Sequence, residues 1–184
     1  MPDATPYRRY AQWLAARDRA AAAEHWETLL ADYEALATLP RAIAGGGAQP
    51  YDLAWSLPAA DADQLRALAS AQQVTLNILV RALWGVLLGA HNHATDVVFG
   101  ATVSGRPEEL PGAEQLVGLT INTVPVRVRW SPAETLATLA RRLQEQSLAG
   151  RPHEHASLAA VLRGRPLLDH VLVFENYPAG SGLA

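Results

Sequence analysis

Two apolar, β-branched segments, Asp96–Val103 and Thr120–Trp130, constrain the fold of this 184-residue chain more than any other feature. Runs of this length and composition predict strands that lie inside a sheet. Pro125 interrupts the second run. Because proline cannot donate a ladder hydrogen bond, we expect a bulge or a free sheet edge there. His170–Glu175 predicts a third core strand, and the alternating pattern of Tyr51–Leu57 predicts a further strand.

Helical periodicity fills most of the chain around these strands. We expect helices over the end of Pro2–Arg17, Ala20–Leu36, Asp61–Gln72, Leu76–His91, Ser131–Gly150 and Ala156–Leu162. Asp61, Thr75 and Ser131 are residue types that cap helix N-termini, and Pro132 suits a first helical position. Strands that alternate with long helices predict an α/β sandwich in one domain.

The composition excludes several classes of function. Hydrophobic residues make up 49% of the chain and charged residues 18%, which is ordinary for a globular protein and argues against disorder. The net charge is only −3 and no basic stripe occurs, so we expect no nucleic acid partner. The chain has no cysteine, which excludes disulfides and cysteine-ligated zinc.

The sequence shows no membrane signal. Its first residues lack the apolar core of a signal peptide. The most apolar stretch, Val74–Ala90, contains Asn77 and Arg81 and is too short and too polar to span a bilayer. We therefore expect a cytoplasmic protein that has no membrane partner.

Four motifs occur in order along the chain: YRRYAQWLAARD, TVSGRPEELPG, VGLTINTVPVR and LVFENYP. Together they resemble the C-terminal half of the condensation domains of nonribosomal peptide synthetases. In the first motif, Tyr7 and Trp13 match a Tyr-x-Asp-x-x-x-Trp pattern, whereas Arg9 stands where Asp is usual. The resemblance covers nearly the whole chain.

The third motif also matches with one departure. Gly118, Asn122 and Thr123 fit the family pattern Val-Gly-x-Phe-Val-Asn-Thr, whereas Thr120 stands where Phe is common. The family's catalytic signature, His-His-x-x-x-Asp-Gly, does not occur anywhere in the sequence. We therefore assign no catalytic residue.

The resemblance implies a fold like that of chloramphenicol acetyltransferase. Such domains have two lobes arranged as a V, with the catalytic histidine in the first lobe. We expect this chain to be a single lobe, a two-layer α/β sandwich. Residues 1–184 would form a partial condensation domain: the C-terminal lobe, without the N-terminal catalytic lobe and without the last strands and helix.

The resemblance also implies a function. Condensation domains form peptide bonds between aminoacyl and peptidyl thioesters that are bound to carrier proteins. A C-terminal lobe would complete the substrate tunnel without being catalytic alone. Its partners would be carrier proteins, the N-terminal lobe and an adjacent adenylation domain. We expect no directly bound cofactor, only the phosphopantetheine arm of the carriers. A single lobe should also expose a broad apolar face where its partner lobe belongs.

Candidate residues of the substrate tunnel or the lobe interface lie at strand ends or within the motifs. They are Ser104, Gly105, Arg106, Gly118, Asn122, Thr123, Glu175 and Asn176. For Asn122 the alternative is that its amide satisfies backbone groups, as buried amides usually do. Arg106 has the alternatives of pairing with Glu108 or Glu109, or with a carboxylate across the lobe interface.

Other polar groups carry less. His153 and His155, two residues apart on an extended segment, could face one ligand, but they lack a third ligand and the spacing of zinc proteases. We therefore predict no metal site. Ser157 lacks the Gly-x-Ser-x-Gly elbow of hydrolases. The Gly45–Gly47 run does not follow a strand and open a helix, so it predicts a surface loop.

Two alternatives to the tunnel-completing lobe remain open. The chain could be a non-catalytic, condensation-like interaction module that recruits carrier proteins or partner enzymes, which the missing catalytic motif would permit. It could also be an enzyme that forms its site across subunits, as trimeric acetyltransferases of this fold do. No histidine in a recognised catalytic context supports the last alternative.

Overall fold

The structure is a computed structural model that describes residues 4–40 and 52–175. In chain order its elements are α1 (Tyr7–Ala15), α2 (Arg19–Leu29), α3 (Ala59–Ala71), α4 (Leu76–Asn92), β1 (Asp96–Val103), η1 (Ala113–Gln115), β2 (Asn122–Arg129), α5 (Leu136–Gly150), η2 (Arg151–His153), α6 (Leu158–Leu162) and β3 (Val171–Leu172). In the described part the sheet has the strand order β2-β1-β3. β1 runs antiparallel to β2 and parallel to β3.

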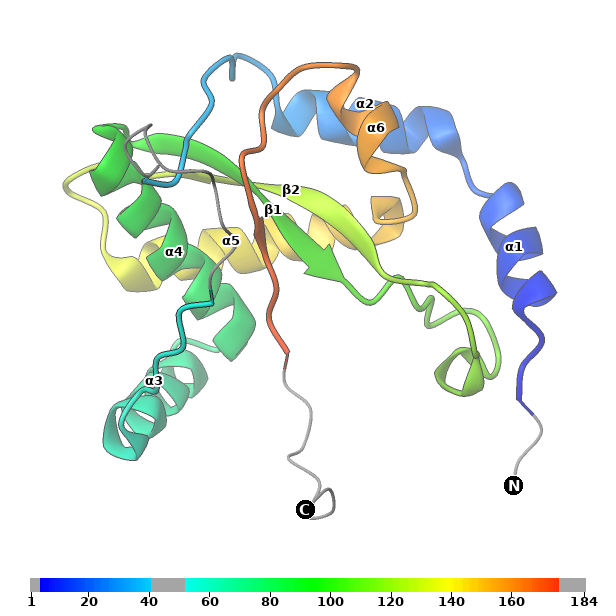
Figure 1. The fold of residues 1–184 in the computed structure, drawn as a ribbon, viewed down its shortest axis with the longest axis horizontal. Helices are drawn as coiled ribbons and strands as arrows, with labels where there is room; N and C mark the ends of the chain where they lie inside the picture. The colour runs from blue at the N-terminus through cyan, green and yellow to red at the C-terminus, as the bar shows by residue number, and fades with distance from the viewer. Residues whose placement is uncertain (1–3, 41–51, 176–184) are drawn as a thin grey trace.

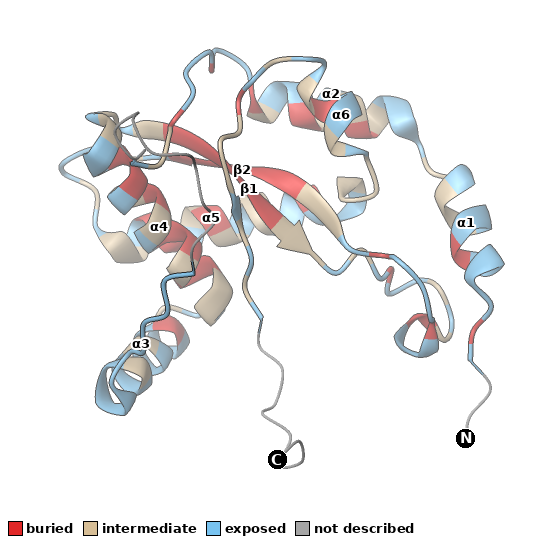
Figure 2. Ribbon diagram, in the orientation of Figure 1, coloured by how far each residue is buried: buried red, intermediate tan, exposed pale blue. Residues whose placement is uncertain are grey.

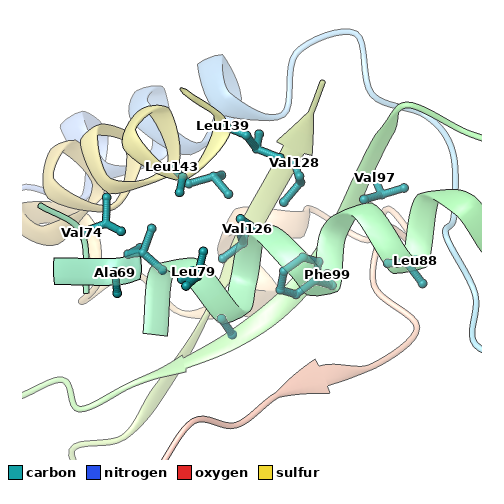
Figure 3. Close-up of a cluster of buried hydrophobic side chains, with 14 of the residues drawn as sticks. Ala69, Val74, Leu79, Leu88, Val97, Phe99, Val126, Val128, Leu139 and Leu143 are labelled. Atoms are coloured by element: carbon teal, nitrogen blue, oxygen red, sulfur yellow. The ribbon is translucent and has the colours of Figure 1, made fainter. Parts of the chain in front are cut away.

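Helices cover both faces of this sheet (Figure 1). The predicted α/β architecture of a single lobe is confirmed. The main core lies between the sheet and helices α4 and α5, where Phe99 of β1 and Val128 of β2 pack against Leu79 and Leu143 (Figure 3). Figure 2 shows the burial concentrated in the strands and α4, whereas α3 is largely exposed.

A second apolar cluster lies on the other face of the sheet. Val98 of β1 packs there with Trp26, Leu30 and Val161, which come from α2, its C-terminal end and α6. Val97, Val98 and Phe99 are all fully buried although neighbouring side chains of a strand point to opposite faces. β1 is therefore a central strand that is covered on both sides, as its continuous apolar run predicts.

A buried arginine joins α2 to the sheet. Arg127 of β2 donates to Asp96 at 2.7 Å and to the carbonyls of Leu29 and Ala31 at 3.0 and 2.5 Å. Its guanidinium also lies 5.3 Å from the centre of the Tyr33 ring. The neighbouring arginines hold the pKa of the Asp96 carboxyl below its ordinary value, although burial alone would raise it. The carboxylate therefore remains ionised and paired.

Helix α4 begins and ends as its sequence predicts, to within a residue. The Thr75 hydroxyl accepts from the Ile78 backbone N–H at 3.2 Å, which caps the first turn. Gly85 lets the helix approach β2 closely, because a Cβ on Gly85 would lie 2.6 Å from the side chain of Val128. The helix is pressed against the sheet at this glycine.

We expect Gly85→Ala to destabilise the fold by about 1–3 kcal/mol through overpacking against Val128. Helix propensity alone would stabilise the helix by ~1 kcal/mol, so the sign tests the close approach. Urea unfolding of this variant, of Val128→Ala and of the double variant would measure it. Costs that simply add in the double variant would contradict a direct clash.

Two strand predictions are corrected by the structure. Residues 52–57 form no strand, and Leu53 and Trp55 are 87% and 80% exposed, so the alternation of Tyr51–Leu57 has no sheet partner within the described residues. The predicted third core strand, His170–Glu175, is reduced to the two residues of β3. Its Val171 lies at a sheet edge and is 45% exposed. Pro125, in contrast, lies in the edge strand β2, as predicted.

Three helix boundaries are also corrected. The expected helix Ala20–Leu36 ends at Leu29, because Asp32 adopts a left-handed conformation with φ of 59°. The start of α3 is Ala59 after Pro58, so Asp61 lies in the first turn and is not the cap. Helix α5 starts at Leu136 and not at Ser131, because Thr135 supplies the capping hydroxyl. The Gly45–Gly47 run lies outside the described residues.

A neutral histidine attaches the edge strand β3. The backbone carbonyl of His170 accepts from Gly100 at 3.1 Å, and its Nε2 accepts from Trp84 Nε1 at 2.9 Å. Burial lowers the pKa of His170, outweighing the nearby Asp169 carboxylate. Because an acceptor nitrogen cannot be protonated, this contact requires the neutral ring.

We expect stability to fall with acidification through His170. Its folded-state pKa lies below the unfolded value of about 6.5, so the stabilisation is complete above that pH and is lost as the pH falls. His170→Gln keeps an acceptor for Trp84 but cannot titrate. Urea unfolding at about pH 7 and about pH 5 should show a smaller loss of free energy in the variant. An identical loss in both proteins would contradict the assignment.

Candidate functional site

A cavity of about 530 Å³ opens at the C-terminal end of β1. Its walls come from α4, the loop after β1, the second half of α5 and the segment that follows η2. Helix α1 adds Trp13, which stacks on Tyr10 at a centroid distance of 5.8 Å and carries the guanidinium of Arg17 over its ring. The first sequence motif therefore builds one wall of this cavity.

A buried guanidinium lies in the cavity wall. Arg81 of α4 is only 6% exposed, and its one hydrogen bond within the described structure is a long contact of 3.5 Å from Nη2 to the Thr102 carbonyl. Its Nε is buried without a partner there. Burial lowers the pKa of Arg81, partly offset by the charge of Glu154. A buried cation with so few partners is costly unless a bound group completes its hydrogen bonds.

Glu154 faces the same cavity from the other side. Burial raises the pKa of its carboxyl, opposed by the charges of Arg151 and Arg81. Within the described structure, Glu154 and Arg81 influence each other electrostatically but form neither a hydrogen bond nor an ion pair. The cavity thus contains a cation and a carboxyl group that do not directly contact each other.

Asn122 holds the wall that carries Glu154. Its Nδ2 donates to the carbonyls of Glu154 at 2.6 Å and Ala156 at 2.7 Å, and its Oδ1 accepts from the Thr123 backbone N–H at 2.9 Å. The amide therefore serves backbone groups, which is the alternative that the sequence left open. Asn122 positions the residue 154–156 segment against β2.

We expect Asn122→Asp to destabilise the fold by about 2–3 kcal/mol near neutral pH, because a carboxylate would face two carbonyl oxygens. That contact would raise the pKa of the introduced carboxyl. Stability should then recover as the pH falls through the raised value, since the protonated acid can donate one hydrogen bond. Denaturant unfolding across the acidic range would show this recovery. Asn122→Ala is the control, which should lack it; equal stability of Asn122→Asp and the natural chain near neutral pH would contradict this role.

Ser104, Gly105 and Arg106 line the cavity as the chain leaves β1. Gly105 has φ of 61°, and a Cβ there would lie 1.8 Å from the Thr120 carbonyl oxygen, so only glycine fits. Arg106 donates to the carbonyls of Ala113 and Leu116 at 2.5 and 2.9 Å. It pairs with neither Glu108 nor Glu109 in the described structure; it fixes the loop instead.

Gly118 and Thr123 lie outside the cavity wall. Gly118 has φ of 152° and contacts the Tyr7 ring, whose hydroxyl donates to the Leu119 carbonyl at 2.8 Å. The first and third motifs therefore meet at this glycine. Thr123 lies within β2 opposite Thr102. Glu175 is exposed after β3, and Asn176 lies outside the described residues.

The two histidines near the cavity do not face one ligand. His153 lies in η2 and stacks on His25 at a centroid distance of 4.5 Å, and burial lowers the pKa of both rings. His155 lines the cavity, with its Nδ1 2.9 Å from the Pro152 carbonyl and its Nε2 buried without a partner in the described part. The expected extended segment is instead a 3-10 turn. Within residues 4–40 and 52–175, no group of three potential ligands could hold a metal ion.

Sequence reasoning missed the residues that give the cavity its polarity. Asn77 and Arg81 were noticed only as interruptions of an apolar stretch, yet they lie four residues apart on one face of α4 and both line the cavity. An arginine inside an otherwise apolar helix was the available signal. Chemically, the cavity can bind and orient a polar group, but no nucleophile hydrogen-bonded to a base lines its described walls.

The membrane test gives a limited result. In the described residues no single helix is long and apolar enough to cross a membrane. Helices α3 and α4 pass the length and composition test only together, and they are bent by 105° at the break between them. The buried face of α4 belongs to the main core.

Comparison with known families places the chain. The model of the condensation domain matches residues 1–181. The chain belongs to the condensation-domain family. A mycosubtilin synthase of Bacillus subtilis has one polypeptide that is 40% identical over 181 residues, which are 95% of this chain and 7% of that polypeptide. Surfactin synthase subunit 3 of Bacillus subtilis strain 168 is 39% identical over 183 residues, 97% of this chain and 14% of that subunit.

Solved structures show the same fold. The first condensation domain of the CDA synthetase superposes with a TM-score of 0.74 at 22% identity, over 92% of this chain and 39% of that chain. A holo four-domain nonribosomal peptide synthetase bound to AMP and glycine gives a TM-score of 0.71 at 20% identity, over 89% of this chain and 13% of that chain. This condensation-domain sequence therefore spans well under half of the solved condensation domain.

Proposed function

We propose that this chain is the C-terminal lobe of a condensation domain and completes the tunnel in which carrier-bound thioesters form a peptide bond. The family match over residues 1–181 carries the proposal. Two facts support the assignment to a lobe: the chain covers 39% of a solved condensation domain, and its sequence has no His-His-x-x-x-Asp-Gly run. On this proposal residues 1–184 form one partial domain that acts in the cytoplasm.

The chemistry explains why another lobe is needed. The amine nitrogen of one carrier-bound substrate attacks the thioester carbonyl of the other, the C–N bond forms, the C–S bond breaks, and a proton must leave the amine. Such a reaction needs positioning, a group that accepts the proton, and stabilisation of the developing oxyanion. The cavity at the end of β1 supports the positioning role. The proton acceptor would come from the lobe with the histidine signature.

The partners follow from the same proposal. Both substrates would arrive as thioesters on phosphopantetheine arms, so the lobe would meet two carrier proteins and bind no cofactor of its own. An adjacent adenylation domain would load the carriers. The cavity provides a wall for an arm and its acyl group, and its opening at the end of β1 lies beside the Ser104–Arg106 loop.

An exposed apolar segment supports the missing-lobe proposal. Val117, Leu119 and Ile121 are 75%, 77% and 61% exposed on the stretch that leads into β2. Their backbone is held from behind by Tyr7 and Gly118, so the segment is positioned although its side chains contact little. Exposed apolar side chains in a row commonly mark a surface that another protein or lobe covers.

The deciding experiment is complementation. The chain is mixed with a lobe that carries the His-His-x-x-x-Asp-Gly signature and with two aminoacyl-loaded carrier proteins, and the dipeptidyl carrier is sought by intact mass. We expect product only when both lobes are present. Association of the lobes without product would overturn the tunnel proposal and favour a non-catalytic interaction module.

We further expect Ile121→Asp to weaken association with that lobe at least about tenfold without unfolding the chain, because this side chain is exposed here and would be buried there. Leu87→Asp is a matched control, since Leu87 has the same 61% exposure on a different surface. Sedimentation or calorimetry of both variants would measure the affinities. Equal weakening by the two substitutions would contradict a specific contact at the Val117–Ile121 segment.

A further inference from the structure

The most unusual chemistry in the cavity is an unsatisfied donor beside an unsatisfied acceptor. Arg81 Nε and Asn77 Oδ1 are both buried and have no hydrogen-bond partner within the described structure. Both residues line the cavity, and their spacing of four places them on one face of α4, one turn apart. Buried polar groups are almost always paired, so a neighbouring donor and acceptor without partners point to an absent ligand.

The pairing specifies the chemistry of that ligand. A carboxamide or peptide amide has one acceptor oxygen and at least one N–H, so it can accept from Arg81 and donate to Asn77 at the same time. A carboxylate could accept from Arg81 but would oppose its lone pairs to Asn77 Oδ1. An ammonium could donate to Asn77 but would be repelled by the guanidinium.

The electrostatics of the cavity also favour a neutral group. Glu154 lies across the cavity from Arg81 and lends it charge compensation without touching it. A neutral amide leaves this balance unchanged, whereas a carboxylate would add a negative charge beside Glu154. Burying an extra uncompensated charge is far more costly than burying a hydrogen-bonded amide.

We propose that Asn77 and Arg81 form an amide-recognition subsite in the cavity at the end of β1. The identity of the donor of that amide rests on the proposed function. It is either the side-chain carboxamide of a carrier-bound acyl group or an amide of the pantetheine arm. Arg81 gives the acceptor oxygen of the amide its partner, and Asn77 takes the N–H.

Small probes can test the subsite on the chain by itself. Three methyl esters of matched length differ only at the far end: the glutaramic acid ester ends in a carboxamide, monomethyl glutarate in a carboxylate and methyl hexanoate in a methyl group. Ligand-observed NMR titration would give their affinities, with pantetheine as the fourth probe. We expect the carboxamide ester to bind at least about tenfold more tightly than the carboxylate and methyl probes.

Two variants assign the binding to the subsite. Arg81→Met keeps the apolar stem but removes the donor, and Asn77→Leu removes the acceptor without leaving a buried charge. Each should weaken amide binding about tenfold. Arg151→Met is the control, because Arg151 lines the same cavity but is exposed and paired with Glu108 at 2.9 Å. If Arg81→Met does not fold by circular dichroism, Asn77→Leu alone decides.

The outcomes separate the source of the amide and the underlying function. Pantetheine that binds with dependence on Asn77, and competes with the carboxamide ester, assigns the subsite to the arm; no competition assigns it to the acyl side chain. Tighter binding of the carboxylate, or affinities that ignore Asn77 and Arg81, would overturn the proposal. Dipeptide formation in the two-lobe assay with no dependence of probe binding on these residues would reject the subsite and leave the proposed function standing.

Discussion

Burial of β1 on both faces is the constraint on which the rest of the structure depends. Val97 and Phe99 pack toward α4 and α5, whereas Val98 packs toward α2 and α6. A shift of one residue in register would exchange these two sets of side chains, so the pairing with β2 is strongly specified. The point at which β1 ends is thereby fixed, and with it the loop that begins at Ser104 and borders the cavity.

The cavity depends on segments that are distant in the sequence, and most of the motif residues serve to hold those segments together. Asn122 ties the residue 154–156 segment to β2, Arg106 ties the loop after β1 to η1, and Gly118 receives the Tyr7 ring. These residues are recognisable in the sequence because their geometry tolerates few alternatives. The side chains that remain unsatisfied in the cavity, Asn77 and Arg81, lie outside the quoted motifs.

The sequence predicted elements whose signal is local and strong. Helix α4, with Thr75 as its cap, and the continuous apolar run of β1 were predicted correctly because capping and burial act within each segment. Predictions failed where tertiary context decides. Residues 52–57 have the alternation of a strand but no neighbour in the described structure. Ser131 could cap a helix, but Thr135, four residues later, forms the observed cap. The candidate site could be predicted only in part for the same reason. The position of Ser104–Arg106 after a strand was visible in the sequence, since loops at strand ends commonly border sites in α/β folds. That Arg106 would donate to two carbonyls, and that Arg81 would lack such partners, depends on how the loop and α4 meet.

Two features of the molecule are unfavourable for a free-standing domain, and both lie near the end of β1 and the start of β2. Arg81 is a buried cation with one long hydrogen bond, and the segment with Leu119 and Ile121 exposes large apolar side chains to water. Each has a stability cost that nothing in the described residues offsets. A lobe that covers the apolar segment and an amide that pairs with Arg81 would remove the two costs separately. The two features therefore predict distinct binding partners, one a protein surface and the other a small polar group within the cavity.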